Sequence, residues 1–223
     1  MNKIVIFGSG AHAKVVLSEI IQIKKYNAVG FIDERVKKGT VIYTQNKKKY
    51  RVIGNIDDLK KIYNQNIYGI IGIGSNFLRK KIATQINRKF KRFKWIAVIS
   101  NNSILNGKVK VNCGSLIVSG SVINTGTVIG KHCIINTSSS IDHDNDLKNF
   151  SSTGPRVTTG GNVKLGECSH IGIGSIVKNG AMIKNNSIIG AKSLVLKNCE
   201  KNSLYYGVPA KRIRKRKSNE NYL

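Results

Sequence analysis

Residues 115–147 read SLIVSGSVINTGTVIGKHCIINTSSSIDHDNDL and repeat a six-residue pattern. Each repeat opens with an aliphatic residue, such as Ile117 or Ile123, and carries a small residue four places later, such as Ser121 or Thr127. A period of six fits neither the helical repeat of about 3.6 residues nor the simple alternation of a half-buried strand. It is typical of a parallel β-helix with one short strand per repeat and three repeats per coil.

The pattern runs without insertion from Ile99 to Cys199, which predicts between five and six coils of 18 residues each. Of the 17 leading positions 15 are aliphatic, and the two exceptions are Thr153 and Thr159. In the small-residue position only Asn145 is out of character. Successive coils of such a helix stack at about 4.8 Å, the spacing between neighbouring strands. We therefore predict a β-helical domain over residues 99–223, with a basic tail at its end.

Residues 1–98 predict a different, Rossmann-like α/β domain, because strands alternate with helices. The expected strands cover residues 4–7, 28–32, 67–73 and 95–99, and the expected helices lie near residues 11–23, 57–62 and 77–90. The first strand leads through Gly8 and Gly10 into a helix, which places backbone N–H groups where a phosphate could bind. Asp33 follows the second strand, where ribose recognition usually falls. The glycine motif is incomplete, since its third glycine is replaced by Ala13.

Composition narrows the class of protein. No apolar stretch is long enough to span a membrane, and the first ten residues lack a signal-peptide profile. Four cysteines without CxxC spacing are expected to be free thiols in a reducing cytoplasm. The net charge of +27 raises the possibility of nucleic-acid binding. However, lysines are spread along the chain, apart from a cluster at residues 211–217, and aromatic stacking platforms are missing, so we expect no nucleic-acid partner.

Several motifs resemble the NeuD/PglD-like sugar acyltransferases of the left-handed β-helix superfamily. They are IVIFGSGAH at residues 4–12, FIDE at 31–34, IGSN at 73–76 with RKKI at 79–82, NTSSSIDHD at 136–144, GGNV at 160–163 and YGVPAK at 206–211. The resemblance covers nearly the whole chain. It implies a left-handed β-helix, a homotrimer with sites between subunits, and acetyl-CoA as co-substrate. The acetyl group would pass directly to a sugar amine or hydroxyl.

The resemblance implies that His143 is the general base, that Asp144 orients it, and that the N–H of Gly161 polarises the thioester carbonyl. Direct acyl transfer needs one base near neutral pH, which suits a histidine with an ordinary pKa of about 6.5. Asp142, Asp144 and Asp146 surround the ring in sequence and would raise that pKa. The alternative is a surface histidine on a turn, as we expect for His132 and His170.

The remaining site residues also come from the resemblance. Those expected to bind a nucleotide-linked sugar are Gly8, Gly10, His12, Asp33, Glu34 and Asn76. Those expected to bind acetyl-CoA are Gly161, Gly172, Gly174, Gly190, Ala191, Lys192 and Lys211. The chain departs from the family at Ser152, where a second histidine is common. This departure puts the contacts to coenzyme or acceptor in doubt, but not the base.

We therefore expect a cytoplasmic acetyl-CoA-dependent N-acetyltransferase acting on a UDP-, GDP- or dTDP-4-amino-4,6-dideoxyhexose for surface glycans. One alternative is O-acetylation of sialic acid or a related free sugar. A zinc carbonic anhydrase on the same type of helix would need a histidine five residues after His143, where Lys148 stands, so no metal is expected. The non-enzymatic alternative is a basic trimeric scaffold.

Overall fold

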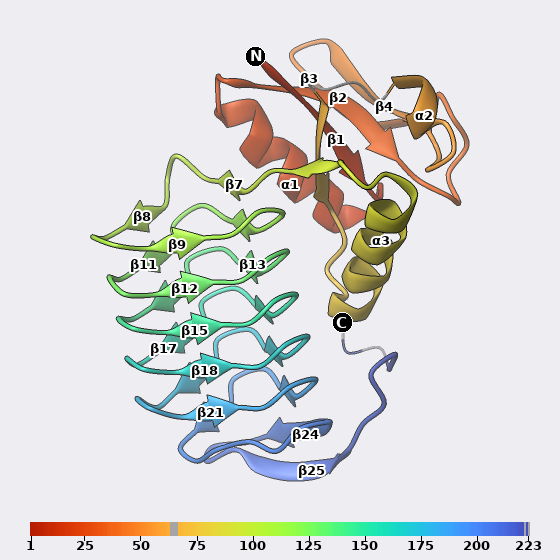
Figure 1. Cartoon of the computed structure of the whole chain (residues 1–223). Helices are drawn as coiled ribbons and strands as arrows, with labels where there is room; N and C mark the ends of the chain where they lie inside the picture. Colours follow the sequence, from red (N-terminus) through yellow and green to blue (C-terminus); the bar gives the residue numbers. More distant parts are fainter. Residues whose placement is uncertain (63–66, 221, 223) are drawn as a thin grey trace.

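The structure is a computed structural model that describes residues 1–62, 67–220 and 222. An α/β part sits at one end of a long triangular prism of stacked coils (Figure 1). This arrangement confirms the predicted Rossmann-like domain followed by a left-handed parallel β-helix.

The α/β part contains one six-stranded sheet in the order β3-β4-β2-β1-β5-β6. All neighbouring strands are parallel except β3 and β4, which form an antiparallel hairpin that the sequence analysis did not identify. The strands are β1 (Asn2–Phe7), β2 (Tyr26–Ile32), β3 (Val41–Gln45), β4 (Lys48–Gly54), β5 (Ile67–Ile71) and β6 (Lys94–Trp95). The helices are α1 (Ala11–Gln22), α2 (Leu59–Ile62) and α3 (Asn76–Lys89).

The prediction of one strand over residues 95–99 was wrong. Residues 94–95 form β6 in the first sheet, whereas residues 98–99 form β7, the first strand of the prism. The chain changes sheets between them, so an apolar run that looks continuous in sequence serves two separate cores.

Three sheets form the faces of the prism, and most of their strands are two residues long. The first face contains β7 (Val98–Ile99), β10 (Leu116–Ile117), β13 (Ile134–Ile135), β16 (Ser152–Thr153), β19 (His170–Ile171), β22 (Ile188–Ile189), β24 (Ser203–Tyr206) and the antiparallel β25 (Lys211–Lys215). The second face contains β8 (Ile104–Leu105), β11 (Val122–Ile123), β14 (Ser140–Ile141), β17 (Thr158–Thr159), β20 (Ile176–Val177) and β23 (Leu194–Val195). The third face contains β9 (Lys110–Val111), β12 (Val128–Ile129), β15 (Asp146–Leu147), β18 (Lys164–Leu165) and β21 (Met182–Ile183).

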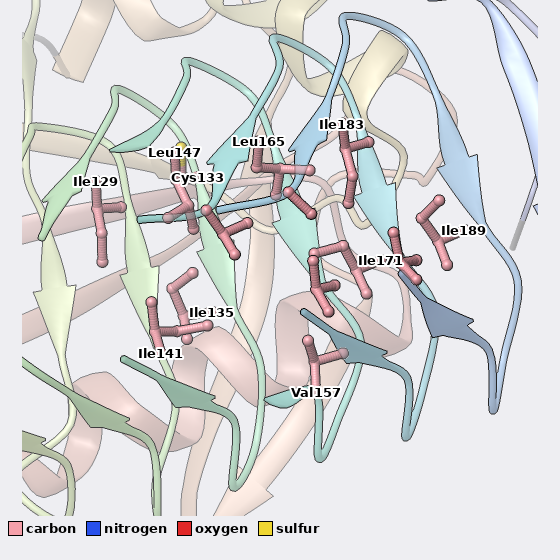
Figure 2. Packing of buried hydrophobic residues seen from close by; sticks show 14 of the residues in the cluster. Ile129, Cys133, Ile135, Ile141, Leu147, Val157, Leu165, Ile171, Ile183 and Ile189 are labelled. Carbon is pink, nitrogen blue, oxygen red and sulfur yellow. The ribbon is translucent and has the colours of Figure 1, made fainter. Parts of the chain in front are cut away.

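The leading aliphatic residues fill the interior of the prism (Figure 2). Each strand pairs in parallel with the strand 18 residues away, so that Ile117 lies beside Ile135. Ile117, Ile129 and Ile141 are fully buried, as expected for a column of inward-facing side chains. Burying such a side chain contributes on the order of 1.5–3 kcal/mol.

The small residues at the corners form hydrogen bonds that tie one coil to the next. Ser115 Oγ donates to the carbonyl of Gly130 at 2.7 Å and accepts the N–H of Cys133 at 2.9 Å. Ser175 Oγ likewise donates to the carbonyl of Gly190. The corner position therefore requires a hydroxyl as much as a small volume, because buried backbone groups need partners.

The junction between the two parts is closely packed. Residues of α1, β1 and β2 share an apolar cluster with Leu116, Val118 and Ile134 of the prism. Beside it, the guanidinium of Arg79 on α3 is 1% exposed and binds only oxygen atoms. Its carbonyl partners are Ile73 and Gly74 in the α/β part, and His132, Phe150 and Ser151 on the prism.

Replacing Arg79 with leucine should destabilise the protein strongly. The change would leave several buried carbonyls without a donor, at about 1–3 kcal/mol each. We expect the free energy of unfolding in urea to fall by more than about 3 kcal/mol.

Lys80→Leu is the matched control, because Lys80 pairs with Glu167 across the same junction but is half-exposed. An exposed ion pair contributes at most about 1 kcal/mol. Equal losses for the two variants would contradict the interpretation of Arg79 as the main polar link.

Candidate functional site

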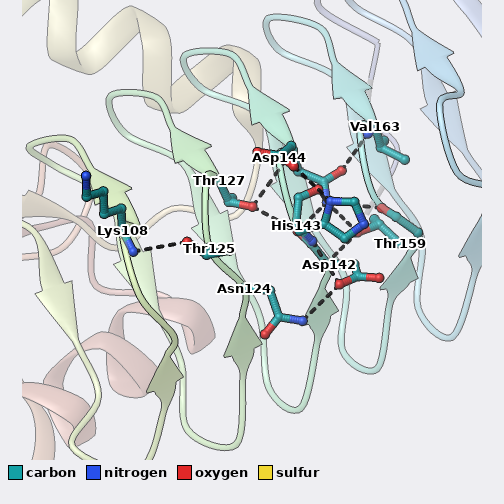
Figure 3. A network of polar contacts seen from close by, with 11 residues as sticks. Lys108, Asn124, Thr125, Thr127, Asp142, His143, Asp144, Thr159 and Val163 are labelled. Atoms are coloured by element: carbon teal, nitrogen blue, oxygen red, sulfur yellow. Dashed lines mark hydrogen bonds and ion pairs between the residues drawn. The ribbon is translucent and has the colours of Figure 1, made fainter.

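His143 lies on the turn that joins β14 of the second face to β15 of the third (Figure 3). Its Nδ1 is 2.9 Å from Oδ2 of Asp144. The backbone N–H of His143 donates to Oδ1 of Asp142 at 2.8 Å, and Asn124 donates to the same oxygen from the preceding coil. The two carboxylates therefore hold both the ring and the backbone of the turn.

These contacts set the charges at the turn. The hydrogen bond to Asp144 raises the pKa of His143 above its ordinary 6.5, and the charges of Asp142 and Asp144 act in the same direction. The pKa of Asp142 is lowered, first by the hydrogen bond from Asn124 and then by the one from the His143 N–H. With Asp144 accepting at Nδ1, the neutral ring carries its proton there and presents a free lone pair at Nε2.

Asn145, the exception in the small-residue position, supports this turn from below. Its buried Nδ2 donates to the carbonyl of Asp142 at 2.6 Å and to that of Gly160 at 3.1 Å. It also reaches the hydroxyl of Thr159, one of the two exceptions among the inward-facing positions. Its Oδ1 accepts the N–H of Val163. The two departures from the repeat thus explain each other, because together they form one buried polar network under His143.

Gly161 lies one coil after His143 and directly against its ring. A Cβ at residue 161 would lie 2.4 Å from both Cε1 and Nε2 of His143. Among the described residues, no acceptor binds the N–H of Gly161. A hydrogen-bond donor and an imidazole nitrogen therefore share one small space on the surface of the prism.

A cavity of about 480 Å³ lies at the carboxyl ends of β1, β2 and β5. Its lining includes Gly8, Gly10, His12, Asp33 and Glu34, five of the six residues predicted to bind the acceptor. Such an edge of a parallel sheet is a common place for nucleotide binding.

The polar groups of this cavity are partly occupied within the chain. Asp33 accepts hydrogen bonds from the hydroxyl of Ser9 at 2.7 Å and from the N–H of Arg35 at 2.9 Å. Although burial acts in the opposite direction, these bonds lower the pKa of Asp33. Burial, followed by the charge of Arg79, lowers the pKa of His12 to about 4, and its buried Nε2 has no protein partner.

Asn76, the sixth predicted acceptor residue, does not line this cavity. Its side chain is 1% exposed at the junction, where Nδ2 donates to the carbonyl of Ser169 and Oδ1 accepts from Arg79 and Ser152. The position of Asn76 therefore favours a structural role over a contact to substrate.

A groove of about 240 Å³ runs along the first face where β16, β19 and β22 end. Its lining includes Gly172, Gly190 and Ala191 among the predicted coenzyme residues. Gly174, Lys192 and Lys211 are not among its described lining residues. The ring of Tyr206 covers Gly190, with a ring carbon 1.7 Å from where a Cβ would lie. Glycine at residue 190 is therefore required by the tyrosine.

The expectation that His132 and His170 are surface residues was wrong. His132 is 3% exposed, stacks on Phe150 at 5.1 Å and meets the edge of Trp95. His170 is 8% exposed, belongs to β19 and lines the first-face groove. The repeat carried a signal for His170 that was not used. It lies 18 residues after Ser152, so the two are strand neighbours.

His143 and the first-face groove lie at different corners of the prism. The groove lies where the chain passes from the first face to the second, whereas His143 lies where it passes from the second to the third. Over the described residues, no group of three potential metal ligands occurs. Nor does any described helix combine the length and apolar character needed to cross a bilayer.

Comparisons with known proteins extend this description. Residues 3–86 match the family model of the PglD N-terminal domain. No curated protein sequence matches the chain. A variant of perosamine N-acetyltransferase from Caulobacter crescentus, solved with CoA and GDP-perosamine, is 26% identical with a TM-score of 0.85 and covers 96% of this chain and 98% of its own.

Two further solved structures share the fold. The acetyltransferase domain of PglB from Neisseria gonorrhoeae FA1090 is 24% identical with a TM-score of 0.86 and covers 96% of this chain and 100% of its own. WeeI from Acinetobacter baumannii AYE is 21% identical with a TM-score of 0.79 and covers 94% of this chain and 99% of its own.

The fold and the site thus define a hexapeptide-repeat acyltransferase that carries a Rossmann-like N-terminal domain. Residues 3–86 belong to the PglD N-terminal domain family, and the architecture of the whole chain is that of the NeuD/PglD-like sugar acyltransferases. The family predicted from the sequence motifs is therefore confirmed.

Proposed function

We propose that this protein transfers an acetyl group from acetyl-CoA to the amine of a nucleotide-linked amino sugar. The observation that carries the proposal is the imidazole of His143 lying against the unpaired N–H of Gly161, with Asp144 bound to its other nitrogen. A base and an oxyanion donor in one small space are what direct acyl transfer requires.

In the proposed reaction the sugar amine attacks the thioester carbonyl carbon while Nε2 of His143 removes a proton from the nitrogen. The negative charge that develops on the carbonyl oxygen is stabilised by the N–H of Gly161. The carbon–sulfur bond then breaks, and the protonated imidazole returns the proton to the departing thiolate. The products are the N-acetyl sugar and CoA, and no covalent enzyme intermediate forms.

The acceptor class is supported by the cavity of the α/β part. Backbone N–H groups around Gly8 and Gly10 and the start of α1 suit a pyrophosphate. Asp33 and Glu34 at the rim are suited to hydroxyl groups of a ribose or base. The perosamine N-acetyltransferase solved with GDP-perosamine supports the same class of acceptor. We infer a UDP-, GDP- or dTDP-4-amino-4,6-dideoxyhexose, used for surface glycans.

We further infer a homotrimer with its sites between neighbouring prisms. The separation of His143 from the first-face groove supports this, because an adjacent copy can bring one corner of its prism against another corner of its neighbour. The four free cysteines suit a reducing compartment, which supports a cytoplasmic enzyme.

The test is a panel of acceptors with the purified full-length protein and acetyl-CoA. UDP-, GDP- and dTDP-linked 4-amino-4,6-dideoxyhexoses are compared with free sialic acid by CoA release and product mass. We expect turnover on at least one nucleotide-linked amine, and none on the matching sugar with a hydroxyl at the same carbon. Turnover on sialic acid alone would refute N-acetylation in favour of O-acetylation, and turnover on no acceptor would support a scaffold.

A further inference from the structure

His170 lies at the wall of the first-face groove and has no role in the reaction proposed above. It belongs to β19, is 8% exposed, and its ring packs against that of Tyr222 with the centroids 4.9 Å apart. Tyr222 is fixed in turn, because its hydroxyl accepts the N–H of Asn76 at 2.9 Å. The imidazole is therefore held in one plane between the prism and the C-terminal segment.

A chain of hydrogen bonds fixes the tautomer of this ring. Arg79 donates to Oδ1 of Asn76, and Nδ2 of Asn76 donates to the carbonyl of Ser169, so the orientation of the amide is set. Ser152 must then donate its hydroxyl proton to Oδ1 of Asn76, at 2.9 Å. Its oxygen lies 2.8 Å from Nδ1 of His170 and can only accept there. His170 consequently carries its proton on Nδ1.

The other nitrogen, Nε2, keeps its lone pair and has no hydrogen bond from the described residues. Burial, together with the nearby charge of Arg79, lowers the pKa of His170 to about 3. The ring thus stays neutral at physiological pH and presents a pure acceptor. A neutral acceptor favours an uncharged N–H donor and disfavours a phosphate, which would need the opposite hydrogen-bonding partner.

We propose that His170 binds the acyl donor, with Nε2 accepting a hydrogen bond from an amide N–H of its pantetheine arm. The proposal rests on the proposed function, since it takes acetyl-CoA as the donor. The groove suits such an arm, because Gly172 lets a ligand approach the backbone and Ile173, Ile188 and Tyr206 supply apolar walls. The arm is narrow and uncharged, with two amides separated by short apolar stretches.

The test compares His170→Asn with His170→Gln. Asparagine keeps a polar atom near Nδ1, facing Ser152, but has none at the place of Nε2. Glutamine can place its amide oxygen, an acceptor, near Nε2. By calorimetry, we expect His170→Asn to bind CoA about tenfold more weakly than the unchanged protein, the usual effect of one lost hydrogen bond. We expect His170→Gln to stay within about threefold.

Pantetheine, which lacks the nucleotide, is the second probe and should show the same loss with His170→Asn. Equal CoA affinities for all three proteins, equal losses in both variants, or a loss seen with CoA but not with pantetheine would overturn the proposal. Failure of the unchanged protein to bind CoA would refute the proposed function itself. In turnover assays, His170→Asn should raise KM for acetyl-CoA while the pH profile of kcat stays in place.

Discussion

The variant His143→Ala should lower kcat by between about a hundredfold and ten-thousandfold, the range expected for a lost general base. The imidazole is 47% exposed and supports no part of the core, so the fold and the affinity for CoA should change little. Steady-state turnover together with calorimetric CoA binding measures both. Lys148→Ala is the control, because Lys148 is an exposed residue of the same coil that pairs only with Asp146.

The same variant should also change the pH dependence. The hydrogen bond from Asp144 raises the pKa of His143 in the folded protein, and a protonated ring has no lone pair with which to accept a proton. With the unchanged protein, kcat/KM should therefore fall as the pH is lowered through a pKa above 6.5. The residual activity of His143→Ala should lack this decline. An unchanged rate and profile would show that His143 is not the base.

The second large effect is expected from Gly161→Ala. The added Cβ would lie 2.4 Å from two ring atoms of His143, a separation that cannot be tolerated, so the imidazole must turn away. The methyl group would also occupy the approach to the N–H of Gly161. We expect kcat to fall by about a hundredfold or more, because both the base and the oxyanion donor are displaced.

Stability and coupling separate this interpretation from a general disturbance. Gly161 has no positive φ, so alanine fits the backbone and the urea midpoint should change little. In a double-mutant cycle, Gly161→Ala should cost less in the His143→Ala background, since the clash is then gone. Fully additive losses would contradict a shared site.

The repeat made much of the fold predictable. Its period fixed which residues face inward, and an offset of 18 placed Gly161 beside His143 before any coordinates were known. This succeeded because a β-helix converts sequence distance directly into spatial distance. The glycine-rich turn and Asp33 were predictable for a similar reason, since both follow strands of one parallel sheet.

Contacts between the two parts of the chain were not predictable in this way. Nothing in the repeat indicates that Asn76 turns toward the prism, or that His132 is buried by Phe150 and Trp95. These placements depend on how α3 packs against the coils, which no local pattern encodes. Asn145 is intermediate. Its departure from the repeat was visible, but its reason appeared only with the hydrogen bonds to Asp142 and Gly160.

The all-oxygen environment of Arg79 has a consequence for kinetic measurements. Five backbone carbonyls and the amide of Asn76 hold the guanidinium, and none of these groups gains or loses a proton between acidic and alkaline solution. A carboxylate in the same position would loosen the contact on acidification. The two halves of the molecule should therefore keep their mutual orientation across the interval in which His143 titrates, and a rate profile recorded there reports on the chemical step alone.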